Sequence, residues 1–158
     1  GQRLIIQGEW KRIKNYIHCL SVEFYHKGEK VLIIDTANSI NPHHPAYNNL
    51  YQESYFKSIY CVRTPLPYDL WARLDTTSSF IQKNKISVLM ITSLSLPFRE
   101  STNPYEIEHL IYNTLKKIDF LTKKFNLITL VGNSPYPEEK AMRASELISQ
   151  ESEILGAV

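Results

Sequence analysis

Short apolar runs rich in β-branched residues alternate along the chain with longer segments in which apolar residues recur at helical spacing. Runs of this kind are typical of strands that are buried on both faces of a parallel sheet. They predict five strands, at Leu4–Gln7, Val31–Asp35, Ile59–Arg63, Val88–Thr92 and Leu127–Val131. Because strands and helices alternate, we expect an α/β fold in which helices cover both faces of one mostly parallel, twisted sheet.

The helical segments are bounded by residues that start or stop helices. Four helices are predicted: from Ile13 through Phe24 to near Gly28, from Leu70 to Asn84, from Pro104 through Leu121, and a polar one from Pro137 to about Ser149. Asn103 is expected to be the N-cap of the third helix, with Pro104 as its first residue.

Composition narrows the class of protein. With 158 residues, 43% of them hydrophobic and 22% charged, the chain is expected to form one globular domain over residues 1–158. A net charge of +2 permits a nucleic-acid partner without requiring one. Cys19 and Cys61 lie far apart in apolar segments, which indicates buried thiols in the reducing cytoplasm. No apolar run reaches membrane-spanning length, so we expect no association with a membrane.

The turn Gly8–Asn15, between the first strand and the first helix, lies where a phosphate-binding loop would be expected. Such a loop has the form G-x-x-x-x-G-K-[ST], in which glycines let backbone N–H groups surround phosphates and the hydroxyl binds Mg²⁺. Gly8 and Lys14 have the right spacing, but Ile13 replaces the second glycine and Asn15 the hydroxyl. We therefore expect Ile13 to pack under the helix and the turn to hold no nucleotide. On spacing alone, an ordinary strand-to-helix turn is the alternative.

The basic residues of this turn are then expected to serve other purposes. Trp10, Lys11 and Arg12 add volume where a phosphate loop has small residues, and the two basic side chains should face solvent or an anionic partner. Lys14 is predicted to hydrogen-bond a strand-end carbonyl or to pair with Asp35. The dipeptide His43-His44 has no third ligand at a diagnostic spacing, so we expect a solvated loop there and no metal.

Four segments together resemble a known family. They are Gly8-Glu9-Trp10 through Lys14-Asn15, Gly28-Glu29-Lys30-Val31 through Ile34-Asp35-Thr36, Ile91-Thr92-Ser93-Leu94 with Phe98-Arg99, and Gly132-Asn133-Ser134. In their order and their strand contexts these segments resemble the core ATPase domain of the RecA superfamily, specifically the archaeal RadA branch and its paralogues. The resemblance covers nearly the whole chain and implies a RecA-like three-layer core with at least five strands.

The departures from the family pattern imply that ATP hydrolysis is lost. Where the family has a magnesium-binding threonine, a metal-holding carboxylate, a water-activating glutamate and a γ-phosphate sensor, this chain has Asn15, Thr92, Ala37 and Ser134. Phosphoryl transfer needs a positioned metal ion and a positioned water. The resemblance therefore implies a pseudo-ATPase with no catalytic residues and no cofactor. Its vestigial nucleotide site comprises Gly8, Lys14, Asn15, Asp35 and Thr92.

In the resembled family, the loops after the fourth and fifth strands bind single-stranded DNA. Here the matching loops offer Arg99, Lys140 and Arg143 for phosphates, and Tyr105 and Tyr136 for stacking on bases. Two glutamates in the second loop oppose this use, and a solvated charged loop remains the alternative. The ten tyrosines are equally suited to a protein partner.

These observations lead to one leading hypothesis and two alternatives. The first is a non-hydrolysing RadA-like paralogue that acts as an accessory or regulatory subunit in recombinational DNA repair. Its expected partners are a RadA-like recombinase or another paralogue, single-stranded DNA, and a second copy in a homodimer. Without the N-terminal helical domain and polymerisation segment of full recombinases, it is not expected to form long filaments alone. The alternatives are a protein-interaction adaptor without DNA binding and a weak nucleotide-binding regulator helped by Lys14.

Overall fold

The apolar runs of the sequence pair as parallel strands of a single sheet. The computed structural model describes residues 1–50, 54–55, 57–100, 103–134, 146, 148 and 154–157. Within them the sheet has six strands in the order β3-β2-β4-β5-β1-β6. Their bounds are β1 Gln2–Gln7, β2 Val31–Asp35, β3 Ile59–Arg63, β4 Val88–Ile91, β5 Ile128–Asn133 and β6 Ile154–Ala157. All five predicted strands are confirmed, with ends that shift by at most two residues.

The sixth strand was not predicted. β6 pairs in parallel with β1, on the side of β1 opposite β5. Its sequence, Ile-Leu-Gly-Ala, has one β-branched residue and a glycine, which weakens the strand pattern. Beyond β1, the described sheet therefore ends in a strand that the hydrophobic pattern does not reveal.

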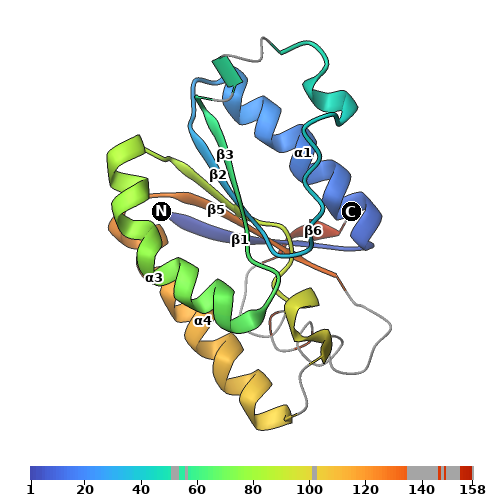
Figure 1. The fold of residues 1–158 in the computed structure, drawn as a ribbon, viewed down its shortest axis with the longest axis vertical. Coiled ribbons are helices and arrows are strands. Elements are labelled where there is room, and N and C mark those ends of the chain that lie inside the picture. Colours follow the sequence, from blue (N-terminus) through green and yellow to red (C-terminus); the bar gives the residue numbers. More distant parts are fainter. Residues whose placement is uncertain are drawn as a thin grey trace.

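Helices cover both faces of the sheet and make a three-layer arrangement (Figure 1). The helix α1 (Trp10–His26) lies on one face, and α3 (Pro67–Asn84) and α4 (Pro104–Lys124) lie on the other. Two short 3₁₀ segments, η1 (Pro45–Tyr47) and η2 (Leu96–Glu100), follow β2 and β4. This is the predicted fold, a mostly parallel α/β sheet between two layers of helices.

Alternation of side chains along the strands builds two separate cores. Ile33 packs on the α1 side with Ile13 and Ile17, whereas its neighbour Ile34 packs on the α3 and α4 side with Leu74. Successive residues of a strand point to opposite faces, so a strand between two helical layers needs apolar residues at every position. The unbroken apolar runs in the sequence are the consequence of this arrangement.

The helix ends follow local sequence signals. Asn103 is the N-cap of α4, because its side-chain oxygen accepts the backbone N–H of Tyr105 at 3.0 Å, and Pro104 is the first helical residue, as predicted. Of the predicted final helix, only Glu146 and Ile148 are described, and both are helical.

Close contact between β4 and β5 depends on Gly132. A Cβ atom placed there would lie 2.0 Å from the Thr92 carbonyl oxygen and 3.1 Å from Cγ2 of Ile13. A glycine is therefore required at the point where β4, β5 and α1 meet.

The expectation of buried cysteines is wrong, since Cys19 and Cys61 are both exposed. Cys19 lies on the outer side of α1, and Cys61 lies on β3, the strand at the end of the described sheet order. At Cys61 the apolar sequence context is a poor guide to burial, because β3 has a neighbouring strand on one side only in the described sheet. Across the described ranges, none of the helices is both long and apolar enough to cross a bilayer.

Candidate functional site

The turn after β1 is shorter than the loop that the spacing of Gly8 and Lys14 suggested. Gly8 and Glu9 alone connect β1 to α1, and the backbone N–H groups of Arg12 and Ile13 both donate to the Glu9 carbonyl oxygen at 3.0 Å. A phosphate cradle requires several consecutive N–H groups that point inward and are not yet bonded. In this turn, Arg12 and Ile13 already use their N–H groups in the first turn of the helix.

Ile13 occupies the space under the turn. It is 0% exposed and packs between α1 and the sheet, as predicted, with Cγ2 directed toward Gly132. Lys11 and Arg12 face solvent, which was also predicted, and Arg12 lies 4.0 Å from the carboxylate of Glu9. The prediction that Ile13 packs under the helix is confirmed.

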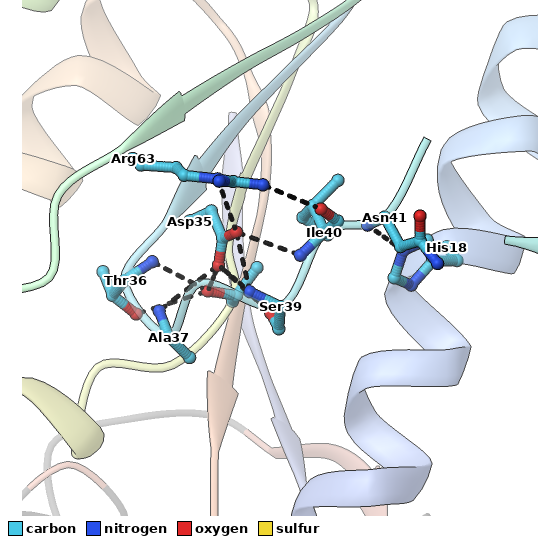
Figure 2. Close-up of polar contacts among 9 residues, drawn as sticks. His18, Asp35, Thr36, Ala37, Ser39, Ile40, Asn41 and Arg63 are labelled. Carbon is cyan, nitrogen blue, oxygen red and sulfur yellow. Dashed lines mark hydrogen bonds and ion pairs between the residues drawn. The ribbon is translucent and has the colours of Figure 1, made fainter. Parts of the chain in front are cut away.

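Asp35, at the carboxyl end of β2, is the centre of a buried hydrogen-bond network (Figure 2). Its carboxylate accepts backbone N–H groups from Ala37, Ser39 and Ile40 at 3.2, 2.9 and 3.0 Å. It also accepts the hydroxyls of Ser39 and Thr92, each at 3.1 Å. With five donors in place, this carboxylate organises the loop after β2 and has little capacity left for a metal ion.

The cation beside Asp35 is Arg63, from the end of β3. Its Nε lies 3.9 Å from Asp35 Oδ2, and its Nη2 donates to the Ile40 carbonyl at 3.3 Å. Among the described residues, Lys14 neither pairs with Asp35 nor donates to a strand-end carbonyl, so neither of its two predicted partners is found. Lys14 lies in the second turn of α1, which begins at Trp10.

Thr92 lies where the resembled family has a metal-holding carboxylate. Its side chain connects the ends of β4 and β2. Its hydroxyl accepts the Thr36 N–H at 2.9 Å and donates to Asp35. The Thr36 hydroxyl in turn donates to the Ser93 carbonyl and accepts the Ser93 N–H at 3.1 Å. A carboxylate at position 92 would face the buried carboxylate of Asp35, so this geometry favours a hydroxyl.

His18 links α1 to the loop after β2, and its tautomer follows from its partners. Nδ1 lies 2.7 Å from the Lys14 carbonyl, which can only accept, so Nδ1 carries the proton. Nε2 accepts the Asn41 N–H at 3.1 Å (Figure 2). The ring is therefore neutral, and burial lowers its pKa from the ordinary value of 6.5.

His44 stacks on His18, with ring centroids 4.1 Å apart and an angle of 16° between the planes. Its Nδ1 accepts the Ala46 N–H at 3.1 Å, so its Nε2 carries the proton and donates to Asn15 Oδ1 at 2.9 Å. Burial and the nearby charge of Lys14 lower the pKa of His44 as well. The expected solvated loop is therefore wrong for His44, and Asn15 anchors this loop.

The outer side of β3 carries a groove that sequence reasoning missed. In the described part of the chain, β3 pairs with β2 alone. A groove of about 720 Å³ lies between β3 and α3, lined by Leu32, Ile59, Tyr60, Cys61, Val62, Arg73, Thr76, Thr77, Ser79 and Phe80. A smaller cavity of about 380 Å³ lies on the α1 side of the same strand. No local signal identifies such a groove, because it depends on which strand ends the sheet.

The candidate DNA-binding residues are only partly described. Tyr105 is 83% exposed at the start of α4. The backbone of Arg99 lies in η2, and its side chain is outside the described set, as are Tyr136, Lys140 and Arg143. Among the described residues, no group of three potential metal ligands occurs.

Comparisons with known proteins place the fold. No family model matches the chain, and no curated protein matches it. Solved structures do match, among them a crystal structure of the RadB recombinase, with a TM-score of 0.67 and 13% identity. The fold is that of a RecA-like recombinase. The match covers 83% of this chain and 61% of that one, so the chain spans about three fifths of the RadB structure.

The role of Thr92 in this RecA-like fold can be tested by substitution. We expect Thr92→Asp to lower the free energy of unfolding by about 3 kcal/mol or more, because it buries a second carboxylate without a partner. Thr92→Val, which removes only the hydroxyl, should cost about 1 to 2 kcal/mol. Denaturant unfolding with and without Mg²⁺ measures both. A Thr92→Asp protein that is as stable as the Val variant, or that Mg²⁺ stabilises, would contradict this assignment.

The two neutral histidines should make stability depend on pH. Their pKa values are below 6.5 in the folded protein, so the unfolded chain takes up protons first as the pH falls. The stabilisation is complete above pH 6.5 and is lost as the pH falls through the lowered pKa values. We expect the melting temperature to drop between pH 7.5 and 5.5, and to drop less in the double variant His18→Gln/His44→Gln. An exposed control, His109→Gln, should retain the wild-type dependence.

Proposed function

We propose that the chain is a pseudo-ATPase: a degenerate RadA-like paralogue of the archaeal type that acts as an accessory or regulatory subunit in recombinational DNA repair. The proposal rests on one observation: polar side chains near the strand ends bind other parts of the same chain. Asp35, Thr92 and Asn15 each bind another part of the same chain where a nucleotide enzyme would bind metal or phosphate. The RecA-like fold supports the recombination setting by analogy.

Loss of hydrolysis follows from the requirements of phosphoryl transfer. The reaction needs a metal ion that bridges phosphates, a positioned water and a cradle for charge. The cradle is replaced by the start of α1, and the metal position is replaced by a Thr92 hydroxyl that is bonded to Asp35. Ala37, where the water-activating glutamate would lie, offers its backbone N–H to Asp35 and has no side chain for proton transfer.

The partner in this proposal docks at β3. An edge strand with an open side can take up an extended segment of another chain through main-chain hydrogen bonds, while adjacent pockets receive its side chains. The groove beside β3 provides such a pocket, with Val62 from the strand and Phe80 from α3 among its apolar lining. We propose that the occupant is an extended segment of a RadA-like recombinase or of another paralogue. The same edge favours a protein adaptor without a DNA role as the second candidate.

Nucleotide binding provides the first test. Titration of Mg-ATP, Mg-ADP and Mg-GTP at millimolar concentration is expected to give no heat of binding, no rise in melting temperature and no turnover. Lys14→Ala is the matched control, because Lys14 stands at the lysine position of the phosphate-loop spacing. Saturable binding that disappears in Lys14→Ala would replace this proposal with a nucleotide-binding regulator.

The docking edge provides the second test. Thr76 is exposed on α3 and lines the groove, so Thr76→Arg should fill the groove without disturbing the core. Titrated against a purified RadA-type recombinase, this variant should bind at least tenfold more weakly than the wild type. Gln82→Arg adds the same charge on α3 outside the groove lining and should bind normally. Equal binding of the wild type, Thr76→Arg and Gln82→Arg would show that the interface lies elsewhere. A wild type that does not bind the recombinase would contradict the accessory role.

A further inference from the structure

The outer face of α4 carries three exposed aromatic side chains. Tyr105, Tyr112 and Phe120 are 83%, 49% and 60% exposed. They are seven and eight residues apart, so they lie on one side of a helix with 3.6 residues per turn. Aromatic rings are less favourable in water than when a partner covers them. A face that carries several exposed rings is therefore a candidate binding surface.

Lysines lie between and beside these rings. The ammonium of Lys116 is 4.4 Å from the centroid of Tyr112, and that of Lys124 is 5.4 Å from Phe120. Lys123 is exposed one turn beyond Phe120. We refer to Tyr105, Tyr112, Lys116, Phe120, Lys123 and Lys124 as the α4 stripe. At a rise of about 1.5 Å per residue, it extends over roughly 28 Å.

The positive charge of the α4 stripe is not neutralised by its neighbours. Within the described residues, Lys116, Lys123 and Lys124 have no carboxylate within ion-pair distance, whereas the adjacent Lys117 pairs with Asp75 at 2.8 Å. The nearby Asp119 is bound to Arg3 at 2.5 Å. The carboxyl-terminal half of the stripe therefore presents three free positive charges beside exposed rings.

These features identify the class of partner. Protein interfaces are depleted of lysine, so a lysine-rich face fits a protein partner poorly. Single-stranded nucleic acid offers both of the complementary groups, because its phosphates attract lysine and its unpaired bases stack on aromatic rings. We propose that the α4 stripe binds single-stranded nucleic acid, with the lysines on phosphates and the rings on bases.

This inference rests on the proposed function for its DNA-repair setting but uses a different part of the molecule. α4 packs against α3 and β1, whereas the groove for a protein partner lies between α3 and β3. The stripe shares Tyr105 with the residues that the sequence suggested for DNA after β4, and its other five members lie further along α4. Nucleic acid and a recombinase segment could therefore be bound at the same time.

Fluorescence anisotropy of a labelled 20-nucleotide oligo-dT, and of an RNA of the same length, tests the assignment at several salt concentrations. The plot of log K against log salt is expected to have a slope of about −2 for three phosphate contacts. The triple variant Lys116→Ala/Lys123→Ala/Lys124→Ala should bring this slope close to zero. Phe120→Ala and Tyr112→Ala should each weaken binding about fivefold or more without changing the slope. The control Lys11→Ala, on the exposed side of α1, should bind like the wild type.

Three outcomes would overturn the proposal. Wild-type affinity in the stripe variants, with loss of binding in Lys140→Ala/Arg143→Ala, would assign nucleic acid to the loop instead. Equal competition by heparin or polyglutamate, with no effect of the aromatic variants, would show a general anion surface. No binding by the wild type would eliminate the site altogether. Each of these results leaves the recombinase titration of the preceding subsection intact, so a failure here is distinguishable from a failure of the accessory role.

Discussion

The structure depends on satisfying one buried carboxylate, that of Asp35. A charge without solvent is costly unless several donors and a cation compensate it. Its donors come from the loop after β2 and from β4, and its cation comes from β3. The ends of three strands are thereby held together by one side chain. In the same loop, the backbone N–H of Asn41 donates to Nε2 of His18. The position of α1 is therefore linked to the same network.

A nucleotide site would have to compete with contacts that hold the present loop. A metal ion near Thr92 would compete with Asp35 for the hydroxyl, and a phosphate at the turn after β1 would need the N–H groups that begin α1. Restoring one catalytic residue would leave the others engaged in the fold. Asn15, Ala37 and Thr92 are therefore all engaged in holding one loop in place.

Sequence reasoning succeeded where information is local and failed where it is not. Five of the six described strands and the plug formed by Ile13 could be predicted, because apolar runs and the missing glycine carry their own physical meaning. Lys14 was predicted to pair with Asp35 or to hydrogen-bond a strand-end carbonyl. The fold instead places Arg63 beside Asp35, from a position 28 residues further along the chain. The stacking of His18 on His44 likewise joins a helix to a loop. Such pairs depend on strand order and loop path, which periodicity does not encode.

One edge strand of the described sheet, β3, connects the network to the surface. β3 and β6 end the described sheet order, and the groove of about 720 Å³ lies beside β3. Arg63 ends β3, is 58% exposed in its side chain, and lines cavities beside this strand. It is also the cation that compensates Asp35. A ligand shifts a conformational equilibrium only through groups whose contacts differ between the states. A partner at β3 that binds the Arg63 guanidinium therefore acts directly on the loop held by Asp35. The sheet edge at β3 and the loop held by Asp35 are therefore coupled by a single side chain.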